Sequence, residues 1–148
     1  MTFRSLVAAA LLVSGMAHAA DAPSIKAGDG WLRVLPGTLP AGGYVNFENL
    51  SDRAVSIVGA SSPDYAEAMI YRSSTDGGMG RMEMVDSVAL PPKGKLAFSP
   101  GGYHVMLTNA KHPVKPGDKL VVTFAFSDGE KLPVTFLARP ANATGPAD

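Results

Sequence analysis

Cysteine is absent from the 148-residue sequence. The chain therefore cannot form a disulfide, even in an oxidising compartment that would permit one. Thiol nucleophiles, cysteine-based zinc sites and thiol–disulfide exchange are excluded for the same reason. A blue-copper electron-transfer centre is also excluded, because its copper is bound by a cysteine thiolate.

An excess of positive charge is absent as well. The sequence holds 13 lysines and arginines against 13 acidic residues, without a basic patch, so we expect no nucleic-acid partner.

Long apolar runs are also missing. The run over residues 6–13 is far shorter than the roughly 20 residues that a membrane-spanning helix needs, and no second run follows it. We therefore expect no membrane insertion.

The first residues have the pattern of a secretory signal peptide. Arg4 precedes the apolar run, and a small-residue motif, AHA, ends at position 19. This pattern predicts cleavage after Ala19, and the lack of a lipobox cysteine argues against a lipoprotein. We expect three parts: a signal peptide over residues 1–19, one exported β domain over residues 20–139, and a flexible, proline-bearing tail over residues 140–148.

Helical patterns are lacking too, since no segment combines a capping residue with about ten residues of amphipathic periodicity. Apolar residues instead alternate with others, which is typical of strands. The clearest case is a pair of alternating runs over residues 119–127 and 130–138, joined by Asp128-Gly129. This dipeptide predicts a tight hairpin, because glycine adopts a positive φ without steric cost.

The rest of the chain has the same character. Its 16 glycines and 12 prolines punctuate short alternating segments, and the glycine-rich stretch at residues 76–80 fits a hairpin turn. About seven to nine short strands at this spacing predict an all-β fold, a Greek-key β-sandwich or barrel. The further strands are expected over residues 28–36, 41–52, 53–63, 67–73, 80–88, 94–100 and 102–109.

Methionine is concentrated in one part of the predicted domain. All methionines beyond the signal peptide lie between positions 69 and 106, namely Met69, Met79, Met82, Met84 and Met106. Residues two apart on a strand point to the same face. Three pairs follow this spacing: Met82 and Met84, His104 and Met106, and Met69 and Tyr71. If these segments are neighbours in the sheet, thioethers and one imidazole meet at one place.

These residue types suit one kind of metal. Thioether sulfur is soft and uncharged, so it prefers Cu(I) to Ca²⁺ or Mg²⁺. A neutral imidazole adds a stronger donor above its pKa of about 6.5. Zinc is less well served, because zinc sites draw mainly on cysteine, histidine and carboxylates. The sequence therefore indicates labile Cu(I) binding.

Core packing is the competing interpretation, since methionine commonly fills gaps in protein interiors. Against it, Val105 and Leu107 already supply the inward apolar face of their strand. The alternate residues, His104 and Met106, are therefore expected on the outer or rim face. His112 lies in a proline-flanked loop and fits an ordinary solvated histidine.

Three stretches of the sequence, spread over nearly the whole of the expected mature chain, resemble the periplasmic copper chaperone family PCu(A)C. Residues 31–52, WLRVLPGTLPAGGYVNFENLSD, are similar to the family's opening segment. GGYHVML and the later KPGDKLVVTFAFSDGE are similar to its copper-site strand and terminal hairpin. The family's copper motif is His, ten residues, Met, twenty-one residues, His, one residue, Met. Met82, His104 and Met106 fit its last three members, whereas Tyr71 stands where the family has its first histidine.

This resemblance implies a cupredoxin-like β-fold and a periplasmic protein that carries Cu(I) to the CuA site of cytochrome c oxidase. It implies the oxidase copper subunit and a Sco-type protein as partners, and the three matching residues as ligands. Tyr71 departs from the motif, and a phenol is a poor Cu(I) ligand. The site is then three-coordinate, with weak Cu(II) binding at most, or it recruits a fourth soft ligand from Met69, Met79 or Met84.

Two other classes of function stay open at this point. The first is a metal-free β-sandwich for adhesion or assembly, in which the methionines only pack. The second is an enzyme, but the sequence has no G-x-S-x-G elbow, no H-E-x-x-H zinc motif and no phosphate-binding loop. We therefore expect a copper carrier without catalytic activity, with the metal-free domain as the alternative.

Overall fold

The computed structural model describes residues 24–147, so the predicted signal peptide over residues 1–19 lies outside the described residues. The described chain forms ten strands and one short 3₁₀ turn, with no helix that is long and apolar enough to cross a membrane. The elements are β1 (Ile25–Arg33), β2 (Ala41–Asn49), β3 (Val55–Ser61), β4 (Tyr65–Ser74), η1 (Asp76–Gly78), β5 (Arg81–Met84), β6 (Val88–Leu90), β7 (Lys95–Phe98), β8 (Tyr103–Ala110), β9 (Lys119–Phe126) and β10 (Lys131–Arg139).

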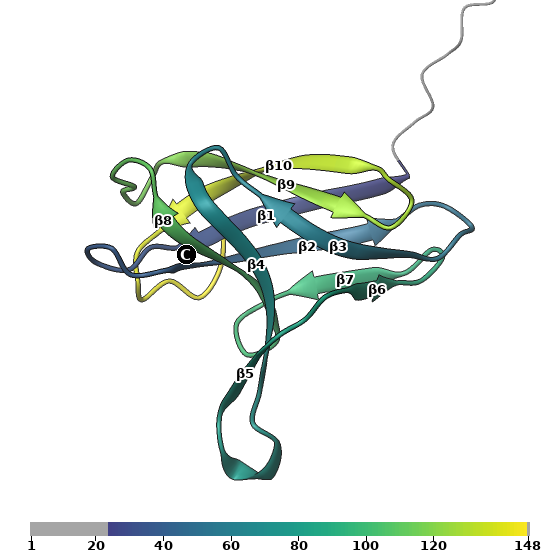
Figure 1. Cartoon of the computed structure of the whole chain (residues 1–148), viewed down its shortest axis with the longest axis horizontal. Coiled ribbons are helices and arrows are strands. Elements are labelled where there is room, and N and C mark those ends of the chain that lie inside the picture. The colour runs from purple at the N-terminus through teal and green to yellow at the C-terminus, as the bar shows by residue number, and fades with distance from the viewer. Residues whose placement is uncertain (1–23, 148) are drawn as a thin grey trace, which may run out of the picture.

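The strands form one hydrogen-bonded sheet in the order β5-β4-β8-β2-β1-β10-β9-β3-β6, and β7 pairs with β2 next to β8. β1 and β10 pair in parallel, whereas the other pairs are antiparallel. β3 and β4 are far apart in this order, yet only residues 62–64 connect them. The sheet therefore curls over itself into a sandwich (Figure 1), which confirms the predicted all-β class.

Residues 24–147 form ten strands, one more than the upper end of the predicted range. The segment predicted as a single strand over residues 80–88 forms both β5 and β6. β5 pairs with β4, whereas β6 pairs with β3, and these two positions lie at opposite ends of the strand order. Residues 85–87 carry the chain from one end to the other, and one straight strand could not make both pairings.

The end of β4 and the whole of β5 extend beyond the body of the sandwich as a hairpin (Figure 1). We call this hairpin, residues 71–84, the arm. Its turn contains Gly77 and Gly78, with φ angles of 75° and 78°, a region that glycine adopts at no steric cost. The hairpin turn predicted at residues 76–80 is therefore confirmed.

Buried phenylalanines occupy the centre of the main core. Phe47 meets Phe98 and Phe124 edge to face, with ring centroids 5.5 and 4.9 Å apart, an arrangement that aromatic pairs favour. β9 and β10 present alternate buried residues to this core and pair around Gly129, which has a φ of 89°. The predicted terminal hairpin is confirmed.

A smaller apolar cluster covers the opposite face of β1 and β2. Trp31 and Tyr44 lie directly opposite each other, with ring centroids 4.6 Å apart, and Ala143 completes the cluster. Arg33 donates hydrogen bonds from Nε and Nη2 to the Ala143 carbonyl, at 3.2 and 2.8 Å. Ala143 thus packs against the sandwich, although it belongs to the segment for which the sequence predicts a flexible tail.

Candidate metal centre

Three neighbouring strands, β5, β4 and β8, carry most of the candidate ligands. Met69 lies directly opposite Met106, and Tyr71 lies directly opposite His104. On the other edge of β4, Met84 lies opposite Tyr71. Directly opposed residues of antiparallel strands point to the same face of the sheet. The three segments are therefore neighbours, and these five side chains share one face.

Met82 lies on the same face but farther from the histidine. It is opposite Ser73, one step beyond Tyr71 along β4, and it belongs to the outermost strand. Neighbouring strands are about 4.8 Å apart, and alternate residues about 6.6 Å. The backbones of Met82 and Met106 are then about 10 Å apart across the strands and about 13 Å along them. Met82 is the most distant of the three predicted ligands.

The two faces of β8 divide as the sequence predicts, with one difference in exposure. Val105 and Leu107 are completely buried in the main core, and His104 and Met106 lie on the other face. Met106 is half-buried. His104, expected on an outer or rim face, has only 6% of its surface exposed. A histidine on the face away from the main core is thus itself buried.

Aromatic rings on the two neighbouring strands account for this burial. The Tyr71 ring on β4 stacks beside the imidazole at 5.9 Å and 15°, and the Tyr44 ring on β2 lies at 6.4 Å. Burial lowers the pKa of His104, and a hydrogen bond with the Gly102 backbone opposes only part of this effect. The imidazole is therefore neutral, and able to donate to a metal, at pH values where an exposed histidine starts to protonate.

Three residues that sequence reasoning missed extend this face beyond His104. Trp31 and Tyr44 continue the row of rings, and the Arg33 guanidinium lies 5.7 and 5.8 Å from their ring centroids. Trp31 and Arg33 are two residues apart on β1, so they share a face. This i, i+2 spacing is the signal that could have indicated them. The aromatic row forms a wall on one side of the candidate site.

The other side of the site is open to solvent. Met69 has 41% of its surface exposed and Met84 has 58%, and both line a small surface pocket of about 170 Å³. Met79 follows the turn of the arm and is 71% exposed. The thioethers on β4 and β5 are therefore accessible, while the imidazole is sheltered.

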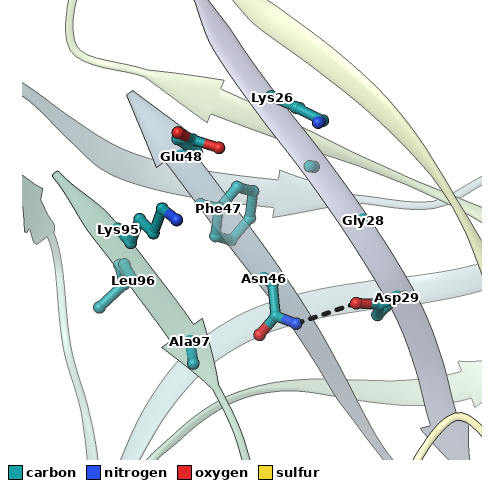
Figure 2. Close-up of a pocket in the computed structure, with 10 residues that line it drawn as sticks. Lys26, Gly28, Asp29, Asn46, Phe47, Glu48, Lys95, Leu96 and Ala97 are labelled. Carbon is teal, nitrogen blue, oxygen red and sulfur yellow. Dashed lines mark hydrogen bonds between the residues drawn. The ribbon is translucent and has the colours of Figure 1, made fainter. Parts of the chain in front are cut away.

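Surface grooves of about 490–510 Å³ lie away from this face, whereas a groove of about 320 Å³ adjoins it at Met69. One of about 510 Å³ runs over β1, β2 and β7, where Lys26, Glu48 and Lys95 line it and Asn46 donates a hydrogen bond to Asp29 at 3.2 Å (Figure 2). Its charges are of both signs, so it favours no one class of ligand. Within residues 24–147, no group of three histidine, cysteine or acidic side chains is placed to hold a metal.

The chemistry of the donors on the methionine–histidine face fits a soft ion. Thioethers and a neutral imidazole carry no charge, and this donor set matches Cu(I) better than Ca²⁺, Mg²⁺ or Zn²⁺. The exposed thioethers also leave the site accessible to an incoming ligand. Such an arrangement suits reversible binding rather than permanent burial of a metal.

The curled sheet and the thioether-rich face beside a buried histidine define a small all-β domain with a soft-donor site. The copper-bound PCuAC domain from PmoF2 is similar, with a TM-score of 0.67 and 23% identity over 82% of this chain and 97% of that domain. CuI-DR1885 from Deinococcus radiodurans has a TM-score of 0.62 and 29% identity over 86% of this chain and 84% of that one. These likenesses confirm the predicted cupredoxin-like fold.

The chain belongs to the LpqE-like family, whose model, "Putative lipoprotein LpqE-like", matches residues 25–138. Together with the PCuAC structures, this match confirms the predicted resemblance to PCu(A)C proteins. "Putative lipoprotein Lxx21020" of Leifsonia xyli subsp. xyli is 28% identical over 115 residues, 77% of this chain and 69% of that protein. "Uncharacterized protein RP573" of Rickettsia prowazekii is 29% identical over 86 residues, 57% of this chain and 48% of that protein.

Proposed function

We propose that this protein is a copper carrier. It holds Cu(I) on the methionine–histidine face of β5, β4 and β8 and passes it to a copper enzyme, without catalysing a reaction itself. The observation that carries the proposal is the register of β4 and β8, which sets Met69 beside Met106 and Tyr71 beside His104. His104 and Met106 are the central ligands, and Met82 is the third donor that the family motif assigns.

A relative supports copper as the cargo. DR1885 of Deinococcus radiodurans, 29% identical to this chain, has a solution structure in its Cu(I) form. Soft, uncharged donors on the methionine–histidine face are of the kind that stabilises Cu(I). Weak Cu(II) binding is the most that such a face supports, because Cu(II) prefers harder nitrogen and oxygen ligands.

The construction of the face also suits a carrier. A metal bound by thioethers moves readily to a site with thiolate ligands, because the thiolates bind Cu(I) more tightly. The receiver implied by the family resemblance is the CuA site of cytochrome c oxidase, with a Sco-type protein sharing the task. The signal peptide predicted over residues 1–19 supports the periplasm as the location of this exchange.

Anaerobic Cu(I) titration against a competing chelator tests the proposal. His104→Ala and Met106→Ala are expected to weaken Cu(I) binding by at least the roughly 10- to 100-fold that loss of a group supporting a metal ligand typically causes. Met79→Ala is the control, because Met79 is 71% exposed beside the turn of the arm. Equal affinity in all four proteins would instead favour the metal-free adhesion or assembly domain.

Delivery needs a separate measurement. The Cu(I)-loaded protein is mixed anaerobically with the copper-free soluble domain of the oxidase copper subunit, and the copper content of each is measured after separation. We expect copper to move to the oxidase domain. If the carrier keeps its copper both with and without a Sco-type protein, the oxidase copper subunit is not the receiver. The copper-binding part of the proposal would still stand.

A further inference from the structure

Tyr71 leaves the proposed copper site one soft ligand short of the family motif. It occupies the position of the motif's first histidine, and its ring lies beside that of His104, nearly parallel to it at 15°. The phenol oxygen is a harder donor than an imidazole nitrogen or a thioether sulfur, so it is a poor partner for Cu(I). The candidates for a replacement are the methionines outside the motif, Met69, Met79 and Met84.

The strand register separates these three methionines. Met79 directly follows η1, the turn of the arm. Met84 lies opposite Tyr71 on the strand beyond it, so Tyr71 stands between Met84 and His104. Met69 lies on the strand next to β8, directly opposite Met106. Of these three methionines, only Met69 has no other side chain between it and one of the central ligands, Met106.

Distance and burial favour Met69 as well. Directly opposed side chains have Cβ atoms about 4.5–5.5 Å apart, and diagonal neighbours lie about 7–8 Å apart. The thioethers of Met69 and Met106 can meet across the shorter distance, because methionine side chains are flexible. Met69 and His104 are diagonal neighbours, about 7–8 Å apart. Met69 is 41% exposed, whereas its neighbour Ile70 is 4% exposed and takes the core position. The Met69 side chain is thus not committed to packing.

We propose that Met69 is a Cu(I) ligand in this chain and takes the place of the motif's first histidine, an inference that rests on the proposed copper-carrier function. Met69 and Met106 then offer thioethers across one strand pair, and His104 offers its imidazole beside them. Tyr71 shelters the imidazole instead of binding the metal. Exchange of an imidazole for a thioether makes the donor set softer, so the site discriminates more strongly against Cu(II).

Methyl NMR tests this assignment directly. The full chain is labelled with ¹³C on the methionine methyl groups, the signals are assigned with single Met→Leu variants, and Cu(I) is added anaerobically. The Met69 and Met106 signals are expected to shift together until copper and protein are equimolar, while Met79 stays in place. A shift of Met106 without Met69 overturns the proposal but supports the carrier function. The absence of a shift at every methionine contradicts both.

Affinity measurements give a second, independent test. Met69→Leu removes the sulfur but keeps an apolar side chain of similar size, and it is expected to weaken Cu(I) binding about tenfold or more, a loss of at least about 1.4 kcal/mol. Met84→Leu is the matched control beyond Tyr71, expected to change the affinity by less than about twofold. Equal affinity of these two variants overturns the role of Met69.

A rescue experiment links Met69 to position 71. Adding Tyr71→His to Met69→Leu is expected to restore Cu(I) affinity, because an imidazole then fills the ligand position left empty. His104→Ala is measured alongside. If His104→Ala binds Cu(I) as tightly as the unchanged protein, the carrier function itself fails; if only the rescue fails, positions 69 and 71 do not serve the same ligand position and the Met69 proposal is overturned.

Discussion

Tyr71 is the single residue at which this chain departs from the copper motif. Its ring stacks beside His104, and Met84 lies across from it on β5. Tyr71→His adds an imidazole on the same face, a stronger donor than the Met69 thioether whose place it takes, so we expect Cu(I) binding to tighten about tenfold. Competition with a Cu(I) chelator measures the change.

The control at this position is Tyr71→Phe, which keeps the stacked ring and removes only the hydroxyl. We expect its Cu(I) affinity to stay within about twofold of the original, because the phenol is not a ligand. A loss comparable to that of His104→Ala would show that the Tyr71 oxygen does bind the metal. It would also remove the reason for seeking a replacement ligand.

Asn49 is the one fully buried polar side chain of the described core, with no exposed surface. Its Nδ2 donates to the carbonyls of Arg53, Leu90 and Pro91 at 2.7, 3.2 and 3.1 Å, and its Oδ1 accepts from the Ser51 backbone and hydroxyl. Asn49→Ala leaves these partners unsatisfied. At about 0.5–1.5 kcal/mol for each of the five lost bonds, we expect the free energy of unfolding to fall by about 3 kcal/mol or more.

Urea unfolding measures this loss, and Asn46→Ala on the same strand is the matched control. Asn46 is exposed and makes a single side-chain hydrogen bond, to Asp29. Its removal is expected to cost less than about 0.5 kcal/mol. Similar urea midpoints for the two variants would mean that water replaces the Asn49 hydrogen bonds, contrary to their burial.

Residue spacing predicts part of the site and misses the rest for a physical reason. The shared face of His104 and Met106 follows from the two-residue period of a strand, which is a local property. The burial of His104 depends on Tyr44 and Tyr71, and these lie on strands distant in the sequence. No local pattern reports how such strands pair, so the sequence places the imidazole on an outer face but not under two aromatic rings.

At the scale of elements, the parallel pairing of β1 and β10 depends on a close backbone approach. A Cβ atom added at Gly30 would lie 2.7 Å from the Thr135 carbonyl oxygen and 3.2 Å from the Phe136 ring. Both atoms are held in the sheet and the core. We therefore expect Gly30→Ala to lower the free energy of unfolding by about 1–3 kcal/mol, the usual cost of overpacking.

Gly28→Ala is the control for this prediction, two residues earlier on β1. A Cβ atom there meets nothing within 4 Å, so the change in stability is expected to stay within about 0.5 kcal/mol. Both variants are compared by urea unfolding. Equal stability would show that β1 and β10 can move apart without cost.

Element boundaries were predictable where the turn chemistry is local. Asp128-Gly129 predicts the β9–β10 hairpin, because the turn needs a positive φ at Gly129 and this is a local requirement. The division of residues 80–88 into β5 and β6 follows instead from two distant partners, β4 and β3. The arm shows the same limit of sequence-based prediction. The motif spacing indicates Met82 as a ligand, whereas the register between β4 and β5 sets Met84 opposite Tyr71. Strand pairing, rather than strand formation, is what the sequence leaves undetermined.

At the scale of the whole molecule, two buried or paired histidines make stability depend on pH in opposite directions. The pKa of His104 is lowered by burial, so the unfolded chain takes up a proton more readily than the folded one. This effect destabilises the fold as the pH falls below 6.5, the ordinary value. The pKa of His112 is raised instead, chiefly by its hydrogen bond to Asp64.

His112 is exposed, as the sequence predicts for its loop, but it also ties that loop to the β3–β4 turn. Its Nε2 donates to Asp64 Oδ1 at 2.8 Å, and its Nδ1 lies 3.2 Å from the Pro113 carbonyl. Only the doubly protonated ring can donate through both nitrogens. The stabilisation is therefore complete below the unfolded pKa of 6.5, and it is lost as the pH rises through the raised pKa of the folded state.

Urea unfolding of the unchanged protein and His112→Gln, from about pH 5.5 to about pH 9, isolates this contribution, because Asp and Glu are ionised throughout that range. The difference in stability is expected to be largest at the acidic end and to disappear at the alkaline end, while the opposing effect of His104 cancels between the two proteins. Asp64→Asn removes the other partner of this pair. In the Asp64→Asn background, His112→Gln should therefore no longer change the stability in a pH-dependent way. A difference that stays constant with pH would mean that His112 acts by neutral packing, and that its charge does not hold the loop to the turn.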